Sequence, residues 1–429
     1  LQDLDMARDL LDELHADGID DAPLHLLMET LEKTCDPDVA LRNLVDIIKA
    51  LQSQGRDFRQ VITDNEGLVR LVTVLGVSDE MGKLMRFRPE LVMAAASDSC
   101  ESHLYNHAQR RAHVLEAVGA DPADNRMPKA TKPLAEAATA LRQTYRKQLA
   151  AIMAQDATAD DPIEIQPRIS QELSDLADAA LEGALAIARN EVDGSEHVRF
   201  AIIGMGKLGA RELNYVSDVD LIYVVEPADA DTNGMTLNRV GTKMATTLQR
   251  VCQSVIMGVA EPTLWQIDGG LRPEGKDGPL VRKLESHEAY YEQWAENWEF
   301  QALLKARPVA GDPDLGQAYM DMTRPFVWIA SKRDNFVYDC QQMRKRVEDL
   351  IPAPLKDREI KLGRGGLRDV EFTVQMLQLV HGRADETLRT SSTLESLQRL
   401  AEVGYVSRRP AKNLSWDYRF ERFMENRHQ

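Results

Sequence analysis

The spacing of apolar residues predicts helices at both ends of the chain and short strands between them. Over residues 1 to about 155, apolar side chains recur every three or four positions, as at Leu41, Leu44 and Ile48, which is the period of an amphipathic helix. A longer helix is predicted to begin near Pro133, because proline in the first turn lacks only an N–H that would be unpaired there. This first region is therefore expected to be helical.

A polar break, Ala157–Pro162, separates that region from a segment of mixed character. A helix is predicted from about Ile169 to Arg189, and another from about Leu237 to Val259. Short runs rich in β-branched residues predict strands, which are Val198–Ile203, Leu221–Val225 and Thr263–Ile267.

Helical spacing returns from about residue 312, and a last helix is predicted from Tyr418 onward. The pattern as a whole predicts an α+β, mostly helical fold. Three domains are expected: an N-terminal helical region at 1–156, a mixed α/β core at 157–311 and a C-terminal helical bundle at 312–429.

Composition and charge narrow the class of protein. The 429 residues are 43% hydrophobic and 28% charged, as in ordinary globular proteins, and no stretch reaches the roughly 18 uninterrupted apolar residues of a membrane span. The net charge of −17 disfavours non-specific binding to nucleic acid. The scattered cysteines fit reduced thiols; they are Cys35, Cys100, Cys252 and Cys340. We expect a cytoplasmic protein that binds neither membranes nor nucleic acid. Because the first residue is not Met, we expect the chain to be part of a longer protein.

Two aspartates begin the second predicted strand. Asp218 and Asp220 lie two residues apart, so on a strand they face the same way. Carboxylates so close repel each other, and a hard divalent cation such as Mg²⁺ removes the repulsion. The preceding loop has Gly204 and Gly206 followed by Lys207, and backbone N–H groups of such a loop can surround phosphate. The pattern indicates metal-assisted chemistry on a phosphate.

A third carboxylate should complete the site from a neighbouring strand. Asp268 follows the third predicted strand, although it could equally be a turn residue before Gly269. Three carboxylates can hold two cations, which together stabilise the attacking and leaving oxygens of an in-line phosphoryl transfer.

Two other nucleotide-binding motifs are disfavoured. The pattern Gly204-x-Gly206-x-x-Gly209 matches the dinucleotide-binding fingerprint, with Glu226 at the end of the next strand. Only seven residues, 210–216, separate the loop from Ser217, whereas a crossover between parallel strands needs about a dozen or more. Leu208 also occupies the Ser/Thr position of a Walker loop.

Cations downstream could neutralise phosphate, although each alone could be a solvated surface charge. They are Arg272, Lys276, Arg282, Lys305 and Arg307. Lys305 and Arg307 follow an apolar run, where charges tend to be paired or functional.

Two further clusters have less specific interpretations. A second glycine-rich loop, 361–372, enters a predicted helix whose N-terminus could hold an anion, or it forms a tight turn with exposed charges. Cys100, His103 and His107 have zinc-like spacing on one helical face, but a polar helix surface explains them better.

Four ordered motifs between residues 204 and 372 identify a family resemblance. They are Gly-Met-Gly-Lys-Leu-Gly with Glu-Leu-Asn and Ser-Asp-Val-Asp-Leu-Ile-Tyr (204–223), Ile-Asp with Leu-Arg-Pro (267–273), Trp-Glu with Lys-Ala-Arg (298–307), and Gly-Gly-Leu-Arg-Asp-Val-Glu-Phe (365–372). The chain resembles the glutamine synthetase adenylyltransferase family, whose members both add and remove adenylyl groups. Gly-Met-Gly, Glu-Leu-Asn and the segment Glu285–Tyr291 look like the N-terminal half of such enzymes.

The resemblance implies a nucleotidyltransferase-type core and an adenylyl-removing activity. In that activity, phosphate attacks the AMP on a tyrosine of glutamine synthetase, and ADP and free tyrosine are released. The resemblance also implies a PII signalling protein as regulator. Asp218, Asp220 and Asp268 would be catalytic and hold two Mg²⁺ or Mn²⁺ ions. Nucleotide and phosphate would be bound by the remaining candidates: Gly204, Gly206, Lys207, Ser217, Arg272, Lys305 and Arg307.

Two other functions stay open at this point. The same site could transfer AMP from ATP to unmodified glutamine synthetase. The segment could also be a non-catalytic module that senses nucleotide or PII, although such a module has no need of three carboxylates.

Overall fold

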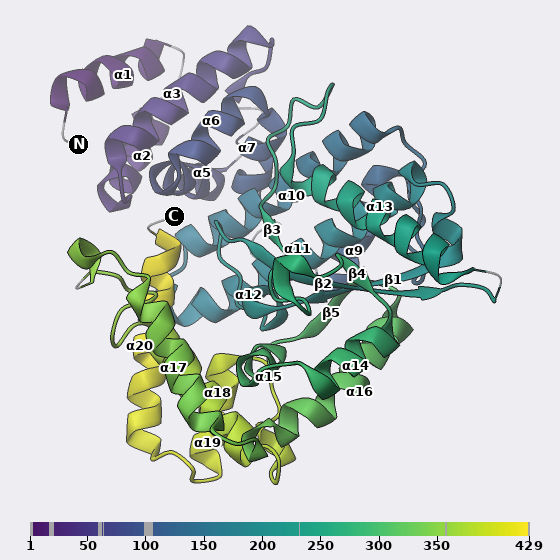
Figure 1. The fold of residues 1–429 in the computed structure, drawn as a ribbon. Helices are drawn as coiled ribbons and strands as arrows, with labels where there is room; N and C mark the ends of the chain where they lie inside the picture. Colours follow the sequence, from purple (N-terminus) through teal and green to yellow (C-terminus); the bar gives the residue numbers. More distant parts are fainter. Residues whose placement is uncertain are drawn as a thin grey trace. The chain divides into compact units, whose positions relative to one another are not determined.

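The computed structural model describes residues 3–16, 21–58, 62, 64–97, 106–230, 232–356 and 358–427 (Figure 1). Its contacts form two compact units. The first, here called the helical unit, is Leu1–Asn106 with Gln143–Glu172, and the second, the sheet unit, is His107–Arg142 with Leu173–Gln429. The limits of these units differ from the boundaries expected at residues 156 and 311. The division into three domains therefore remains a prediction.

The helical unit confirms the periodicity of the N-terminal residues. Leu41, Leu44 and Ile48 are all buried in its core, and Asp36 caps the N-terminus of α3 by accepting from the Val39 N–H. Its helices are α1 (Leu4–Ala16), α2 (Asp21–Lys33), α3 (Pro37–Ser53), α5 (Asn65–Val77), α6 (Asp79–Phe87) and α7 (Pro89–Ala96).

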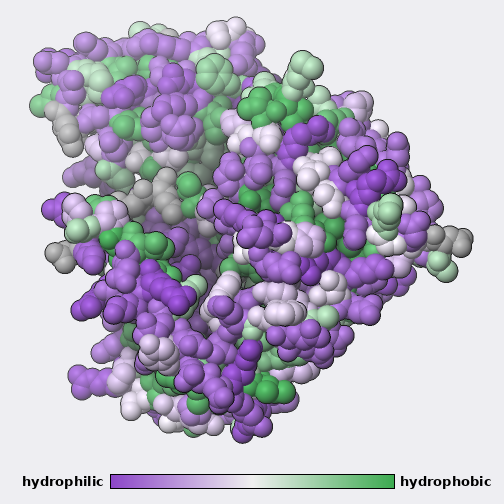
Figure 2. Space-filling model, in the orientation of Figure 1, coloured by the Kyte–Doolittle hydropathy of each residue, from purple (hydrophilic) through white to green (hydrophobic). Residues whose placement is uncertain are grey.

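Two long helices contribute residues to both units. They are α10 (Leu134–Ala157) and α11 (Pro162–Glu191), so the polar break expected at 157–162 is confirmed. The helix α9 (His107–Val118) belongs to the sheet unit. None of the described helices is both long and apolar enough to cross a membrane, and hydrophilic side chains cover most of the face shown in Figure 2.

A five-stranded mixed sheet organises the sheet unit. Its order is β3-β2-β1-β5, with β4 also paired to β2. The strands are β1 (Val198–Gly204), β2 (Val219–Pro227), β3 (Ile267–Asp268), β4 (Val281–Arg282) and β5 (Arg307–Gly311). Strand β1 is antiparallel to both β2 and β5, whereas β3 and β4 are parallel to β2. A dinucleotide-binding crossover requires parallel strands, so the antiparallel pairing of β1 and β2 excludes it.

Helices cover both faces of this sheet (Figure 1). On one face, Ile203 of β1 and Ile222 of β2 share a core with α14–α16. On the other, Gly241 of α13 approaches Val225 of β2. The helices are α12 (Gly206–Gly209), α13 (Gly234–Gln253), α14 (Leu284–Gln293), α15 (Asn297–Leu303) and α16 (Pro313–Ile329).

The described residues from 336 onward form four α-helices, and the last three pack around a separate small core. They are α17 (Phe336–Asp349), α18 (Leu367–His381), α19 (Thr393–Glu402) and α20 (Arg408–Arg427). The helix predicted from Tyr418 onward is present, but α20 begins ten residues earlier, at Arg408, and extends to Arg427. Short 3₁₀ turns connect the larger elements: η1 (Ser195–His197), η2 (Gly275–Asp277), η3 (Ala330–Lys332), η4 (Ala353–Leu355) and η5 (Glu386–Leu388).

The strand expected at Thr263–Ile267 is wrong in extent. Only Ile267 and Asp268 form a strand, and the Ile267 N–H donates to the Gln253 side chain. The segment before it forms no strand, although its side chains have strand-forming character and the Val219 N–H of β2 donates to the Gln266 carbonyl at 2.9 Å. Strand β5 was missed because Pro308 and Gly311 break the pattern by which strands are identified.

The buried His287 should make the stability of the sheet unit depend on pH. Its ring packs edge-on against Tyr319, with ring centroids 5.2 Å apart, and burial lowers its pKa to about 3. Folded His287 therefore stays neutral, whereas the unfolded side chain gains a proton below its usual pKa of about 6.5. The stability that this imidazole contributes is present above about pH 6.5 and is lost as the pH falls toward 3.

Replacing His287 with a residue that cannot be protonated should remove this pH dependence of stability. We expect His287→Phe to reduce the acid-side slope of the unfolding free energy by about 1.4 kcal/mol per pH unit, measured by urea denaturation from pH 7 to 4. The matched control is His25→Phe, because the His25 side chain is 81% exposed. Equal slopes in the wild type and His287→Phe would contradict the assignment.

Candidate active site

A cavity of about 640 Å³ lies in the sheet unit, at the start of β2. Three groups of residues line it. The first is acidic, with Asp218, Asp220 and Asp268, and the second is basic, with Lys207, Lys305, Lys361 and Arg368. The third is a wall of aromatic, apolar and polar residues, Tyr215, Val216 and 263–266. Gly206, Ser217 and Glu371 complete the lining.

Strand pairing brings the three predicted carboxylates together. Strands β2 and β3 are parallel, with Asp220 opposite Asp268 in the register, and Asp218 directly precedes β2. Burial raises the pKa of Asp220 to about 6, and the charges of Asp268 and Asp218 contribute to the rise. Mutual repulsion of this kind is what a bound divalent cation relieves, and the donors are all carboxylate oxygens, which suit Mg²⁺ or Mn²⁺. The residues present therefore fit a divalent metal.

The glycine loop lies against the backbone and side chain of Asp220. Its Met205 N–H donates to the Asp220 carbonyl at 2.9 Å. Gly206 has φ +51°, and a Cβ there would lie 2.5 Å from Asp220 Oδ2, so only glycine fits this conformation and this space. Gly204 ends β1 inside the core, where a Cβ would come within 2.7 Å of Val309. Ser217 lines the cavity, and its hydroxyl donates to the Asp218 carbonyl at 3.0 Å.

Lys207 projects from the glycine loop toward the last helix. Its Nζ donates to Glu425 Oε1 at 2.7 Å. Burial lowers its pKa to about 7, and the nearby charge of Arg422 contributes to the fall. Lys207 thus lines the cavity while it pairs with a carboxylate from α20.

Two predicted phosphate-binding arginines do not line this cavity. Arg272 donates to the carbonyls of Gly269, Lys276 and Gly278, which fixes the loop after Asp268. Arg307 binds the Asp178 carboxylate with two nitrogens, at 2.6 and 3.1 Å. The structure favours a role for both arginines in holding loops.

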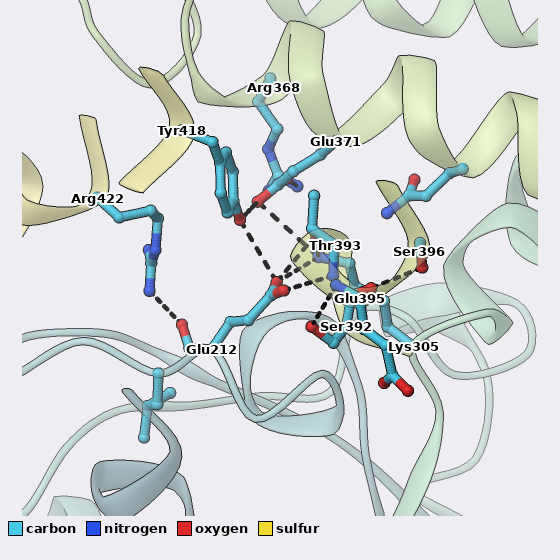
Figure 3. Close-up of polar contacts among 12 residues, drawn as sticks. Glu212, Lys305, Arg368, Glu371, Ser392, Thr393, Glu395, Ser396, Tyr418 and Arg422 are labelled. Atoms are coloured by element: carbon cyan, nitrogen blue, oxygen red, sulfur yellow. Dashed lines mark hydrogen bonds and ion pairs between the residues drawn. The ribbon is translucent and has the colours of Figure 1, made fainter. Parts of the chain in front are cut away.

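Lys305 belongs to a buried polar cluster centred on Glu212 (Figure 3). Its Nζ donates to Glu212 Oε2 at 2.9 Å and to the Thr393 hydroxyl at 3.3 Å. The Thr393 N–H donates to Glu212 Oε1 at 2.6 Å, and the Tyr418 hydroxyl lies 3.4 Å from Glu212 Oε2 and 3.2 Å from Glu371 Oε1. The cluster joins the glycine-loop region to three C-terminal helices.

The second glycine-rich loop supplies cavity residues that were not among the individually predicted site residues. Lys361 and Arg368 lie before and just inside α18, and Glu371 follows one turn later. Burial alone would raise the pKa of Glu371, but the charges of Lys305 and Arg368 outweigh it and bring the pKa to about 2. In the sequence, the glycine pair before a helix indicated that this loop could bind an anion. It did not indicate that the loop would line the same cavity as the three aspartates.

A second acidic cluster is less suited to a metal. His107 lies 3.4 Å from Asp178, and His107, Asp175 and Asp178 are close enough to share an ion. Arg307 already pairs with Asp178, and Arg211 with Asp175, so arginines balance both carboxylates. Cys100 and His103 of the zinc-like spacing lie outside the described residues.

Two family models match the chain. Residues 68–322 match the model described as glutamate-ammonia ligase adenylyltransferase, and residues 341–429 match the model described as GlnD PII-uridylyltransferase. The first match includes all three carboxylates. The second includes Lys361, Arg368, Glu371 and Glu425.

Curated relatives match along nearly the whole chain. A Bifidobacterium longum protein is 77% identical over all 429 residues, which are 40% of its length. Proteins of Cutibacterium acnes and Streptomyces avermitilis are 46% and 44% identical, over 92% and 94% of this chain and 39% and 38% of their own lengths. All three are named bifunctional glutamine synthetase adenylyltransferase/adenylyl-removing enzyme.

The chain therefore spans about two fifths of the length of these relatives. The match of the first model covers more than half of the chain and agrees with the motifs at 204–223 and 267–273. The chain belongs to the glutamate-ammonia ligase adenylyltransferase family, a family of nucleotidyltransferases.

Proposed function

We propose that this segment carries the site that removes AMP from the adenylylated tyrosine of glutamine synthetase by metal-dependent phosphorolysis. The observation that carries the proposal is one cavity that joins the carboxylates of Asp218, Asp220 and Asp268 to four cationic side chains. A nucleotidyl transfer to phosphate needs both groups. The names of the relatives include an adenylyl-removing enzyme, and the motifs resemble the N-terminal half of that family.

The reaction balances without a further reactant. An oxygen of hydrogen phosphate forms a new bond to the phosphorus of the AMP, the bond from that phosphorus to the tyrosine oxygen breaks, and the proton of hydrogen phosphate ends on tyrosine. The products are ADP and free tyrosine.

The protein's own residues bind and position the reactants. Two Mg²⁺ or Mn²⁺ ions held by Asp218, Asp220 and Asp268 would supply Lewis-acid stabilisation of the phosphoryl oxygens. The basic side chains reduce the repulsion between phosphate and the anionic phosphodiester. The wall with Tyr215 and Trp265 offers the flat, partly apolar surface that suits a nucleoside base.

A PII signalling protein is the proposed regulator. Its support is the match of residues 341–429 to a model whose description names PII, together with the family resemblance.

Product analysis tests the proposed reaction directly. The full-length enzyme that contains this segment would be incubated with adenylylated glutamine synthetase, Mg²⁺ and phosphate. ADP release that requires phosphate and stops in the Asp218→Asn variant is the expected result. If Asp218→Asn abolishes AMP incorporation from ATP but leaves phosphorolysis intact, the direction is reversed and this site adenylylates. If neither reaction changes, the segment is not catalytic and a sensing role takes its place.

A further inference from the structure

The four cations of the cavity differ in how fully their side chains are engaged. Lys305 is buried, and its Nζ has Glu212, Thr393 and, at 3.9 Å, Glu371 around it. Three donors of one ammonium thus face three oxygens, so Lys305 supports the polar cluster and has little capacity for a ligand.

Lys207 and Lys361 converge instead on a single oxygen. Glu425 Oε1 lies 2.7 Å from Lys207 Nζ and 3.9 Å from Lys361 Nζ. Both lysines line the cavity, whereas Glu425 is only 5% exposed and is not part of the lining. Its other oxygen, Oε2, accepts from Arg422 at 2.5 Å. One carboxylate oxygen therefore serves as the anion for two cavity lysines.

Arg368 brings a third positive charge to the same region. Its Nη1 donates to Glu371 Oε2 at 2.8 Å, and its guanidinium has further donors. The charges of Arg368 and Lys361 both act on Asp220, so they lie within electrostatic reach of the carboxylates that would hold metal. An anion bound by these cations would adjoin the phosphoryl group to be attacked.

We propose that Lys207, Lys361 and Arg368 form the subsite of the attacking phosphate, and that Glu425 Oε1 occupies this subsite until phosphate displaces it. This subsite rests on the proposed phosphorolysis. It identifies the side chains that would bind phosphate, the nucleophile of that reaction. Hydrogen phosphate carries two charges and several acceptor oxygens, so it can satisfy two ammoniums and a guanidinium better than one carboxylate oxygen does. Glu425 keeps Arg422 as its partner after displacement.

The subsite explains why the C-terminal helices accompany the catalytic sheet. Lys361 and Arg368 come from the loop and first turn of α18, and the competing carboxylate comes from α20. The metal carboxylates come from β2, the residue directly before it, and β3. The sheet would hold the phosphoryl group and the C-terminal helices would hold the nucleophile.

Opposite effects on phosphate affinity test this proposal in the full-length enzyme. Lys361→Gln and Arg368→Gln should each raise the KM for phosphate about tenfold or more, with a smaller change in kcat. Glu425→Gln should lower that KM several-fold, because a neutral amide competes less well for the lysines and can still accept from Arg422. Arg364→Gln is the matched control, since Arg364 lies on the same loop, is 87% exposed and pairs with Glu348.

Direct binding separates this inference from the proposed function. Orthophosphate would be titrated into the enzyme without glutamine synthetase and followed by phosphorus NMR, with Lys361→Arg as a variant that keeps the charge and should keep the affinity. Weaker phosphate binding in Lys361→Gln supports the subsite even if no phosphorolysis is found. Normal phosphorolysis with an unchanged KM in both Lys361→Gln and Arg368→Gln overturns the subsite and leaves the function intact. A raised KM in Glu425→Gln overturns the displacement of Glu425.

Discussion

Asp220→Asn is expected to reduce the phosphorolysis rate about a thousandfold or more. Asp220 follows Asp218 by two residues and is paired in register with Asp268, and all three line the cavity, so its loss should weaken metal binding. Lewis-acid stabilisation of a transferring phosphoryl group amounts to several kcal/mol, and each 1.36 kcal/mol changes the rate tenfold. ADP release at saturating phosphate and Mg²⁺ measures the effect.

The same substitution should stabilise the metal-free protein at neutral pH. The pKa of Asp220, raised to about 6 by burial and by the neighbouring carboxylates, lies above its unfolded value of about 3.9. The stability contributed by the protonated group is fully present below about pH 3.9 and is lost as the pH rises through 6. The asparagine side chain cannot ionise, so we expect the variant to gain on the order of 1 kcal/mol at pH 7 without metal.

Asp277→Asn is the control, because Asp277 lies exposed in the loop after β3 and outside the cavity lining. It should change neither the rate nor the stability. A rate near the wild-type value in Asp220→Asn would contradict the metal assignment, and a metal-free protein less stable than the wild type would contradict the repulsion among the three carboxylates.

Glu212→Ala should destabilise the sheet unit by about 3–5 kcal/mol. Glu212 receives Lys305 Nζ and both the N–H and the hydroxyl of Thr393, and all three residues are buried. Its removal leaves the Lys305 ammonium without its closest counter-charge in the interior, which is among the costliest single changes in a protein. The expected measurement is a lower denaturant midpoint for the transition of the sheet unit.

The neighbouring helix offers a matched control. Glu395 of α19 pairs with Arg399 one turn later, and its side chain is 46% exposed. Such exposed pairs contribute about 0.3–0.5 kcal/mol, so Glu395→Ala should scarcely move the midpoint. If Glu212→Ala were no worse than Glu395→Ala, the buried cluster would not hold the helices to the core.

Elements whose determinants lie close together in the sequence were predictable. The glycine loop, Asp218 and Asp220 occur within 17 residues, 204–220, and strand alternation alone relates the two carboxylates. Asp268 was chosen because a neighbouring strand was expected to supply a third carboxylate, and in the structure the register of β2 with β3 sets it opposite Asp220. The predicted helices succeeded where apolar spacing was regular, as in α3 and α10.

Roles that depend on distant partners were not predictable. Arg307 has the residue type of a phosphate ligand, but its partner, Asp178, lies 129 positions earlier in the chain. Lys207 and Glu425 are 218 positions apart, and no local pattern marks a glutamate in α20 as the partner of a cavity lysine. The sequence shows which side chains are charged, but only the tertiary structure shows which of them form ion pairs.

The pairing of Lys207 with Glu425 also sets an order of events during synthesis on the ribosome. At about 5–20 residues per second, the interval between Asp220 and Glu425 lasts roughly 10–40 s. During this interval, Lys207 of the glycine loop has been synthesised but its partner Glu425 has not. Glu212 likewise precedes its partners Thr393 and Tyr418. Until α20 leaves the exit tunnel, the nascent chain holds charged groups that have no place in an apolar interior, and binding by a chaperone would protect it best in that interval.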